Sequence, residues 1–106
     1  MKPDAATTLL RALRVHFVNP VVEDVKSRSW ASATFVGARH EVGLRLDGDG
    51  AAAAADRFLN GLEERDLDLR DHFLADIRLV AREDGRGPTG EAQIRISIEA
   101  LTGEAG

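Results

Sequence analysis

Apolar residues near the N-terminus recur at the spacing of an amphipathic helix. Asp4 can cap the first turn, because its side chain can accept a hydrogen bond from a free backbone amide. The apolar stripe that follows consists of Ala6, Leu9, Leu10, Leu13 and Phe17. Asn19-Pro20 should end this helix, since proline disfavours helical geometry in the residue before it. Residues 20–28 are then expected to form a connector with some extended character.

The period changes to two between Ser29 and Asp47, which predicts a β-hairpin with its turn at residues 37–40. Both sets of apolar side chains must then lie on one face of the hairpin. The register that satisfies this condition pairs Phe35 with Val42, Ala33 with Leu44 and Ala31 with Leu46. On the reverse face it brings together Trp30 and Asp47, Ser32 and Arg45, and Val36 and Glu41.

A second helix is predicted after the turn Asp47-Gly48-Asp49-Gly50, which can cap it. The helix is expected to run to about Glu64, and its apolar stripe consists of Ala51, Ala55, Phe58, Leu59 and Leu62. Gly61 weakens this pattern, because glycine costs about 1 kcal/mol relative to alanine inside a helix. The helix can therefore stop there.

Two further strands are predicted in the C-terminal part of the chain. The first has an apolar face, made by Phe73, Ala75, Ile77, Leu79 and Ala81, and a mixed face, made by Leu74, Asp76, Arg78, Val80 and Arg82. Residues 84–90 form a loop. The second strand shows the clearest alternation, with apolar positions at Ala92, Ile94, Ile96, Ile98 and Ala100.

These elements bury their apolar faces most simply within a single α+β domain over residues 1–106. The predicted fold is a two-layer αββαββ sandwich, in which both helices cover one face of a four-stranded antiparallel sheet. It is ferredoxin-like by circular rearrangement, with the first strand moved to the end, and this analogy carries no function. The strand order stays open.

Composition narrows the classes of function. The 106 residues are 43% apolar and 30% charged, with a net charge of -4 and no cysteine, which excludes disulfides, thiolate nucleophiles and cysteine-based metal sites. The acidic balance disfavours broad nucleic-acid binding, because neutralising phosphates needs a basic surface. No apolar window reaches the length of a membrane span, and the N-terminus lacks the pattern of a secretory signal. We therefore expect a bacterial cytoplasmic protein.

The glycine-rich and acidic motifs have simple structural explanations. Gly85, Gly87 and Gly90 have the G-x-G-x-x-G spacing, but a strand follows them, whereas a phosphate-binding loop requires a helix. The turn at residues 47–50 lacks the ligand spacing of a calcium loop. The acidic run Glu63, Glu64, Asp66, Asp68 and Asp71 is interrupted by arginines, which is typical of a solvated surface.

The sequence offers few side chains in an arrangement that could support catalysis. The three histidines, His16, His40 and His72, have no local spacing of metal ligands, and no serine lies in a nucleophile motif. We therefore predict no catalytic residues, no metal site and no cofactor, and the sequence favours a protein without enzymatic activity.

The sheet face away from the helices is the strongest candidate for a functional surface. Its predicted interface residues combine apolar side chains with arginines: Trp30, Val36, Arg45, Leu74, Arg78 and Val80. Tryptophan and arginine are enriched at protein interfaces, so we expect self-association, or binding of another protein, through this face. The alternative is a solvated face on which Trp30 lies under arginine stems. RNA binding is disfavoured, because sheets that stack bases normally present several aromatic side chains.

A small-molecule binder or an enzyme is the alternative from a different class. Arg39, His40 and His72 are expected near strand ends, where together they could meet an anionic ligand. A concave pocket lined by these groups would support this alternative.

Two parts of the chain carry a family resemblance. One is the segment SWASATFVGARHEVGLRL, with Trp30, Thr34, Gly37 and His40; the other is the turn AREDGRGPTG, with Asp84-Gly85, which precedes QIRISIEALTGE. Their order resembles that in phage tail-completion (tail-terminator) proteins. This resemblance implies a small α/β subunit that assembles into a ring at a head-tail junction and has no catalytic site. The chain departs from the family's pattern at NPVVEDVKSR, which replaces an extended strand that contains an aromatic residue.

Overall fold

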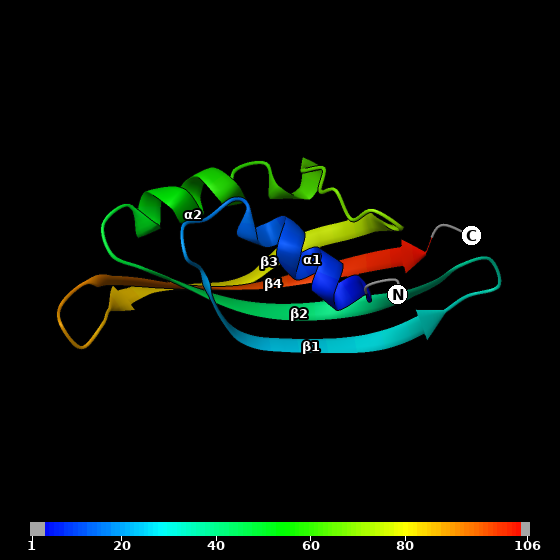
Figure 1. The fold of residues 1–106 in the computed structure, drawn as a ribbon, viewed down its shortest axis with the longest axis horizontal. Coiled ribbons are helices and arrows are strands. Elements are labelled where there is room, and N and C mark those ends of the chain that lie inside the picture. Colours follow the sequence, from blue (N-terminus) through cyan, green and yellow to red (C-terminus); the bar gives the residue numbers. More distant parts are fainter. Residues whose placement is uncertain (1–3, 105–106) are drawn as a thin grey trace.

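The computed structural model describes residues 4–104, which form two α-helices and one four-stranded antiparallel sheet (Figure 1). In chain order the elements are α1 (Ala5–Arg14), β1 (Val21–Ala31), β2 (Val36–Asp47), α2 (Ala51–Leu59), a 3-10 turn η1 (Leu62–Glu64), β3 (His72–Arg86) and β4 (Ala92–Glu104). The predicted α+β class and the order αββαββ are confirmed.

The sheet has the strand order β1-β2-β4-β3, so β2 and β4 are central and the two hairpins lie side by side. Both helices lie on the same face of this sheet, as predicted (Figure 1). The buried side chains at the centre of the interface between the layers are Leu9, Leu13, Val42, Leu44, Phe58, Ile96 and Ile98. The other face of the sheet carries no layer from the described residues, and we call it the open face.

Local sequence explains the first helix well. The Asp4 side chain accepts a hydrogen bond from the Thr7 amide at 2.7 Å, which confirms the predicted cap. The helix ends at Arg14, before Pro20. Residues 21–28 have the extended character expected of them, but they are not a connector, because they belong to β1, which pairs with β2 along its length. β1 is an edge strand that is mostly exposed, so its sequence has no apolar alternation to reveal it.

The first hairpin turns earlier than predicted. Its turn lies at residues 32–35, where the Ser32 hydroxyl accepts a hydrogen bond from the Phe35 amide at 3.1 Å. A serine that binds the backbone two or three residues ahead stabilises such a turn, and this local bond outweighs the short apolar alternation. The predicted pairings, which brought Trp30 near Asp47, are therefore wrong: Trp30 lies opposite Gly37.

The second helix is shorter than predicted. It ends at Leu59, and Gly61 follows with φ of 71°, a left-handed conformation that glycine adopts without strain. Gly50 occupies the N-cap position with φ of 85°, and no side chain caps the helix there. The aspartates of the 47–50 turn thus do not supply the cap that the sequence suggested.

β3 contains two bulges, between Leu74 and Asp76 and between Leu79 and Ala81. Each bulge adds one residue and so reverses the face to which later side chains point. The predicted apolar face of this strand is therefore split: Ile77 and Leu79 lie opposite the covered positions of β4, whereas Phe73 and Ala81 lie on the open face. β3 also continues to Arg86, beyond the predicted start of the loop.

Candidate functional site

Residues directly opposite each other in neighbouring strands present their side chains on the same face, so the strand register divides the open face into transverse rows. On the central strands β2 and β4, three opposed pairs follow one another: Arg45 and Arg95, Gly43 and Ser97, Glu41 and Glu99. With their edge-strand neighbours they define three rows: the arginine row (Arg45, Arg95 and Glu83, joined by Glu23 from the bulge of β1, where Val21 is the residue opposite Arg45), the small row (Asp24, Gly43, Ser97, Ala81) and the glutamate row (Lys26, Glu41, Glu99, Arg78).

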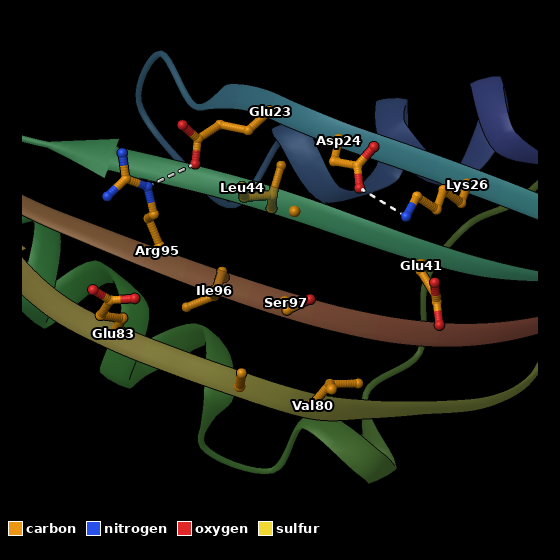
Figure 2. Close-up of a pocket in the computed structure, with 12 residues that line it drawn as sticks. Glu23, Asp24, Lys26, Glu41, Leu44, Val80, Glu83, Arg95, Ile96 and Ser97 are labelled. Atoms are coloured by element: carbon orange, nitrogen blue, oxygen red, sulfur yellow. Dashed lines mark hydrogen bonds and ion pairs between the residues drawn. The ribbon is translucent and has the colours of Figure 1, made fainter.

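In the arginine row, a single carboxylate bridges two opposed arginines. Glu23, which lies in the bulge of β1, places one carboxylate oxygen 3.4 Å from Arg45 Nη1. Its other carboxylate oxygen lies 3.0 Å from Arg95 Nε (Figure 2). Arg45 also binds Asp47, with Nε 3.0 Å from Oδ1. These hydrogen bonds, chiefly the one to Asp47, raise the pKa of the Arg45 guanidinium, which stays charged.

In the glutamate row, only one of the two glutamates has an ion pair. Arg78 Nε lies 3.2 Å from a carboxylate oxygen of Glu99. Lys26 is opposite Glu41, but its ammonium is directed to Asp24, 3.9 Å away (Figure 2). Among residues 4–104, Glu41 has no cation within 4.0 Å. Two like charges therefore lie side by side on the central strands.

The small row forms the floor of a shallow hollow between the charged rows. Gly43, Ser97 and Ala81 have short side chains or none, and the hollow above them has a volume of about 440 Å³ (Figure 2). Arg95 and Glu83 line one side of it and Glu41 the other. It is open to solvent, so it is suited to a broad contact rather than to enclosing a small ligand.

One end of the open face is aromatic. Trp30 and Phe73, on the two edge strands, flank the opposed glycines Gly37 and Gly103 of the central strands. The Trp30 ring lies over Gly37, where an added Cβ would come within 3.0 Å of it, and Phe73 covers Gly103 in the same way. Phe35, in the hairpin turn, packs on Phe73 with ring centroids 5.9 Å apart. Sequence reasoning missed this cluster, because it placed Phe35 within a strand.

The indole Nε1 of Trp30 is buried and has no hydrogen-bond acceptor within the described part of the chain. Burial without a hydrogen bond is costly for a polar group. Trp30 is therefore fixed by packing on Gly37 and not by a polar contact.

The predicted interface residues do not all share one face. Trp30, Arg45 and Arg78 lie on the open face, and Val80 lines the hollow from the second bulge of β3. Leu74 lies opposite Thr102 on the covered face and packs against the core.

The remaining assignments to the open face also need correction. Val36 has the same parity in β2 as the buried His40, so it belongs to the covered face, although it is half exposed beyond the helices. Arg82 was expected beside Arg78, yet it points to the helices and binds Asp56 of α2 at 2.6 Å. The bulges in β3 and the shifted hairpin turn account for these errors, since each changes side-chain parity.

His40 has a structural environment on the covered face. Its Nδ1 is 2.7 Å from Ser27 Oγ and its Nε2 is 2.9 Å from Thr102 Oγ1. Thr102 donates its hydroxyl proton to the Ala38 carbonyl at 3.3 Å, so it accepts from Nε2, and Nδ1 accepts from Ser27. Burial lowers the pKa of His40, which favours this neutral form.

Of the residues proposed to meet an anionic ligand, Arg39 is not brought together with His40 and His72, which both lie on the covered face. Arg39 points to the open face, whereas its neighbour His40 is buried under the helices and engaged on both ring nitrogens. His16 lies elsewhere and packs against the Phe58 ring, with centroids 5.2 Å apart. Among the described residues, no three histidine or acidic side chains are grouped so that they could hold a metal ion.

Neither helix within residues 4–104 has both the length and the apolarity needed to cross a bilayer.

The chain matches no protein-family model, and no curated protein matches it. Among solved structures it is similar to a chain in the virion of a native gene transfer agent (GTA) particle. The two share 19% sequence identity and superpose with a TM-score of 0.64 over 79% of this chain and 67% of the other. At this identity the likeness shows a common fold.

Proposed function

We propose that this chain is a non-catalytic structural subunit of a phage-like particle, and that it associates with other protein subunits through its open face. The observation that carries the proposal is a whole sheet face that nothing within residues 4–104 covers and that presents ordered charged rows around a floor of small residues. A sheet face of this kind offers many weak polar contacts over a broad area, which suits assembly.

The placement of the potentially reactive groups supports assembly over catalysis. His40 is buried, which lowers its pKa, and it is engaged by two hydroxyl groups, whereas Arg39 lies on the opposite face. An enzyme site needs such groups to converge on one concave pocket. The likeness to a virion chain adds support, because the shared fold serves there within a large assembly.

The mass of the purified protein in solution tests this proposal. We expect light scattering, at protein concentrations from micromolar to millimolar, to give a mass of at least twice the 11.5 kDa of one chain. Added salt should reduce the association, since charged contacts are screened. A protein that remains monomeric throughout, at low salt as well as high, would contradict self-association.

A ring subunit of the tail-terminator kind is the more specific candidate. The similarity of the first hairpin segment and of the later turn to that family supports it. A ring needs contacts between two different surfaces of each subunit, so that repeated rotation closes. Electron microscopy of the assembled protein should then show closed rings, and neighbouring genes should encode capsid or tail components. Pairs of subunits without rings would contradict this version and leave the broader proposal standing.

A further inference from the structure

The open face carries a charge pattern with the same order on both central strands. Along β2 the order is Arg45, Gly43, Glu41, and beside it on β4 the order is Arg95, Ser97, Glu99. Because the strands are antiparallel, the two sequences run in opposite directions to give this common spatial order. Both strands thus present a cation, a small residue and an anion, spaced evenly.

The edge strands reverse the sign in each charged row. The arginine row ends in Glu23 and Glu83, so across the sheet it reads negative, positive, positive, negative. The glutamate row ends in Lys26 and Arg78, so it reads positive, negative, negative, positive. The two rows are electrostatic opposites, and the small row lies midway between them.

This pattern is unfavourable within one chain. Like charges directly opposite each other destabilise a sheet, and here both central pairs are of like charge. Glu23 relieves the arginine pair by contacting both members, but the glutamate pair has Arg78 alone and Glu41 has no ion pair among residues 4–104. Proteins break such local rules chiefly at functional or strained sites.

We propose that a second copy of this chain docks on the open face, about a two-fold axis that runs along the small row and perpendicular to the strands. This inference deepens the proposed function and rests on it. The axis carries the arginine row of each copy onto the glutamate row of the other. The register then places Arg45 opposite Glu41, Arg95 opposite Glu99 and Glu83 opposite Arg78, and Glu23 of the bulge lies on the side of Lys26.

The charges select this axis over the other face-to-face arrangement. A two-fold axis parallel to the strands would lay the arginine row on the second arginine row, and like-charge contacts across an interface cost several kcal/mol. The chosen axis passes over Gly43 and Ser97, whose small size lets the two sheets approach. It also brings Arg39, which has no ion pair among residues 4–104, toward Asp47 of the second copy, because both lie four residues from Gly43.

Asp24, at the edge of the small row, faces its own symmetry mate in this arrangement. Each Asp24 has Lys26 beside it at 3.9 Å, which offsets the repulsion. The interface as a whole is polar and self-complementary, as a two-fold contact between identical surfaces must be.

Two charge-reversed variants test the proposal. One carries Glu41→Lys with Glu99→Lys, which makes both rows of the central strands positive. The other carries Arg45→Glu with Arg95→Glu, which makes both negative. Alone, each variant should dimerise at least about 100-fold more weakly than the natural protein, because four like-charge contacts replace four attractive ones.

Mixed in equal amounts, the two variants should form a one-to-one pair with a Kd within about tenfold of the natural dimer, since every facing row is again complementary. Sedimentation velocity measures each species, and circular dichroism shows that each variant is folded. The matched controls carry the same charge changes on the helix layer, as Glu63→Lys with Glu64→Lys and as Arg11→Glu with Arg14→Glu, and should dimerise normally. All four control positions are exposed.

The outcomes separate this inference from the proposed function. If the natural protein associates and the reversed variants associate equally well, both the two-fold pair and self-association through the open face are wrong, and only a subunit role through another surface stands. If the variants dissociate but the mixture does not pair, the alignment of the rows is wrong. A natural protein that is monomeric at every concentration and salt level overturns both.

Discussion

The two faces of the sheet are built from alternate residues of the same strands, yet one face is apolar and buried and the other is charged and exposed. On the covered face, Val42, Leu44, Ile96 and Ile98 are each no more than 2% exposed and form the centre of the core. Their immediate neighbours carry the charged rows of the open face. The alternation of apolar and charged residues thus places the stabilising side chains on the covered face and leaves the open face available for binding another protein.

Each face also contains an exception to its general character. The covered face holds the polar group of His40, Ser27 and Thr102, and the open face holds the aromatic cluster over Gly37 and Gly103. Both exceptions lie toward the same end of the sheet, because His40 and Gly37 are only three residues apart in β2. This end is where substitutions should most sharply test the contrast between the faces.

The largest effect is expected from a cavity on the covered face. Ile98→Ala should lower the free energy of unfolding by about 2–5 kcal/mol, because it removes buried methyl groups opposite Val42 and the core cannot fully close. Urea denaturation measures the loss. The matched variant Ser97→Ala, one residue along on the open face, should change it by less than about 0.5 kcal/mol. Equal losses at the two positions would contradict the division of the faces.

A smaller loss of stability is expected from a substitution at Gly37, where the open face is closely packed. Gly37→Ala should lower the free energy of unfolding by about 1–3 kcal/mol, because the added methyl group meets the Thr102 carbonyl oxygen and the Trp30 ring. Chemical denaturation followed by the fluorescence of Trp30 measures it. Gly85→Ala is the control, since it lies in β3 with open space around it and should be near neutral. A neutral Gly37→Ala would show that the indole does not rest on that glycine.

Protonation of His40 should make the stability of the protein change with pH. Burial lowers the pKa of His40 in the folded protein below its ordinary value of 6.5. Below that pH the unfolded chain binds a proton that the folded chain resists, so stability falls as the pH drops through about 6.5. The Tm should therefore decrease between about pH 7.5 and about pH 5.5.

His40→Gln tests this assignment, because glutamine can still meet both hydroxyl groups but does not titrate. Its Tm should vary less with pH over the same range than that of the natural protein. His16→Gln is the comparison, since burial and then the charge of Arg65 also lower the pKa of His16. If His40→Gln leaves the slope unchanged, the dependence on pH originates elsewhere.

The smallest effect is expected at the like-charge pair of the open face. Glu41→Gln should raise the free energy of unfolding by about 0.2–0.5 kcal/mol at protein concentrations below those of self-association, because it removes the repulsion with Glu99. Thermal unfolding at low salt measures it. Glu83→Gln, opposite Arg95, should give no such gain. A loss of stability in Glu41→Gln would remove the conflict on which the two-fold pairing is argued.

The sequence predicted the fold class because the strongest signals are local. The stripe of the first helix with its Asp4 cap and the alternation of Ile94, Ile96 and Ile98 in β4 each depend on residues close in the chain. The edge strand β1 was not predicted, because neither of its faces is deeply buried and its sequence lacks an apolar pattern. The hairpin turn was displaced because a side-chain bond from Ser32 decides its position.

The candidate surface was predicted as a face, but its residues were predicted only in part. Trp30, Arg45 and Arg78 were placed correctly, whereas Leu74 and Val36 belong to the covered face. The bulges of β3 cannot be read from the sequence, because either parity would bury some of its apolar residues.

By itself, the sequence determined the order of helices and strands, the two-layer packing and the charge of each residue, because these follow from local periodicity and chemistry; it did not determine the bounds of β1 or the position of the first hairpin turn. Only the tertiary structure decided which residues lie opposite one another. The strand order β1-β2-β4-β3 puts Glu41 beside Glu99 and Arg45 beside Arg95, over distances in the chain of about fifty residues or more. The charged rows exist only through that register, which is fixed by burial on the covered face and by the bulges.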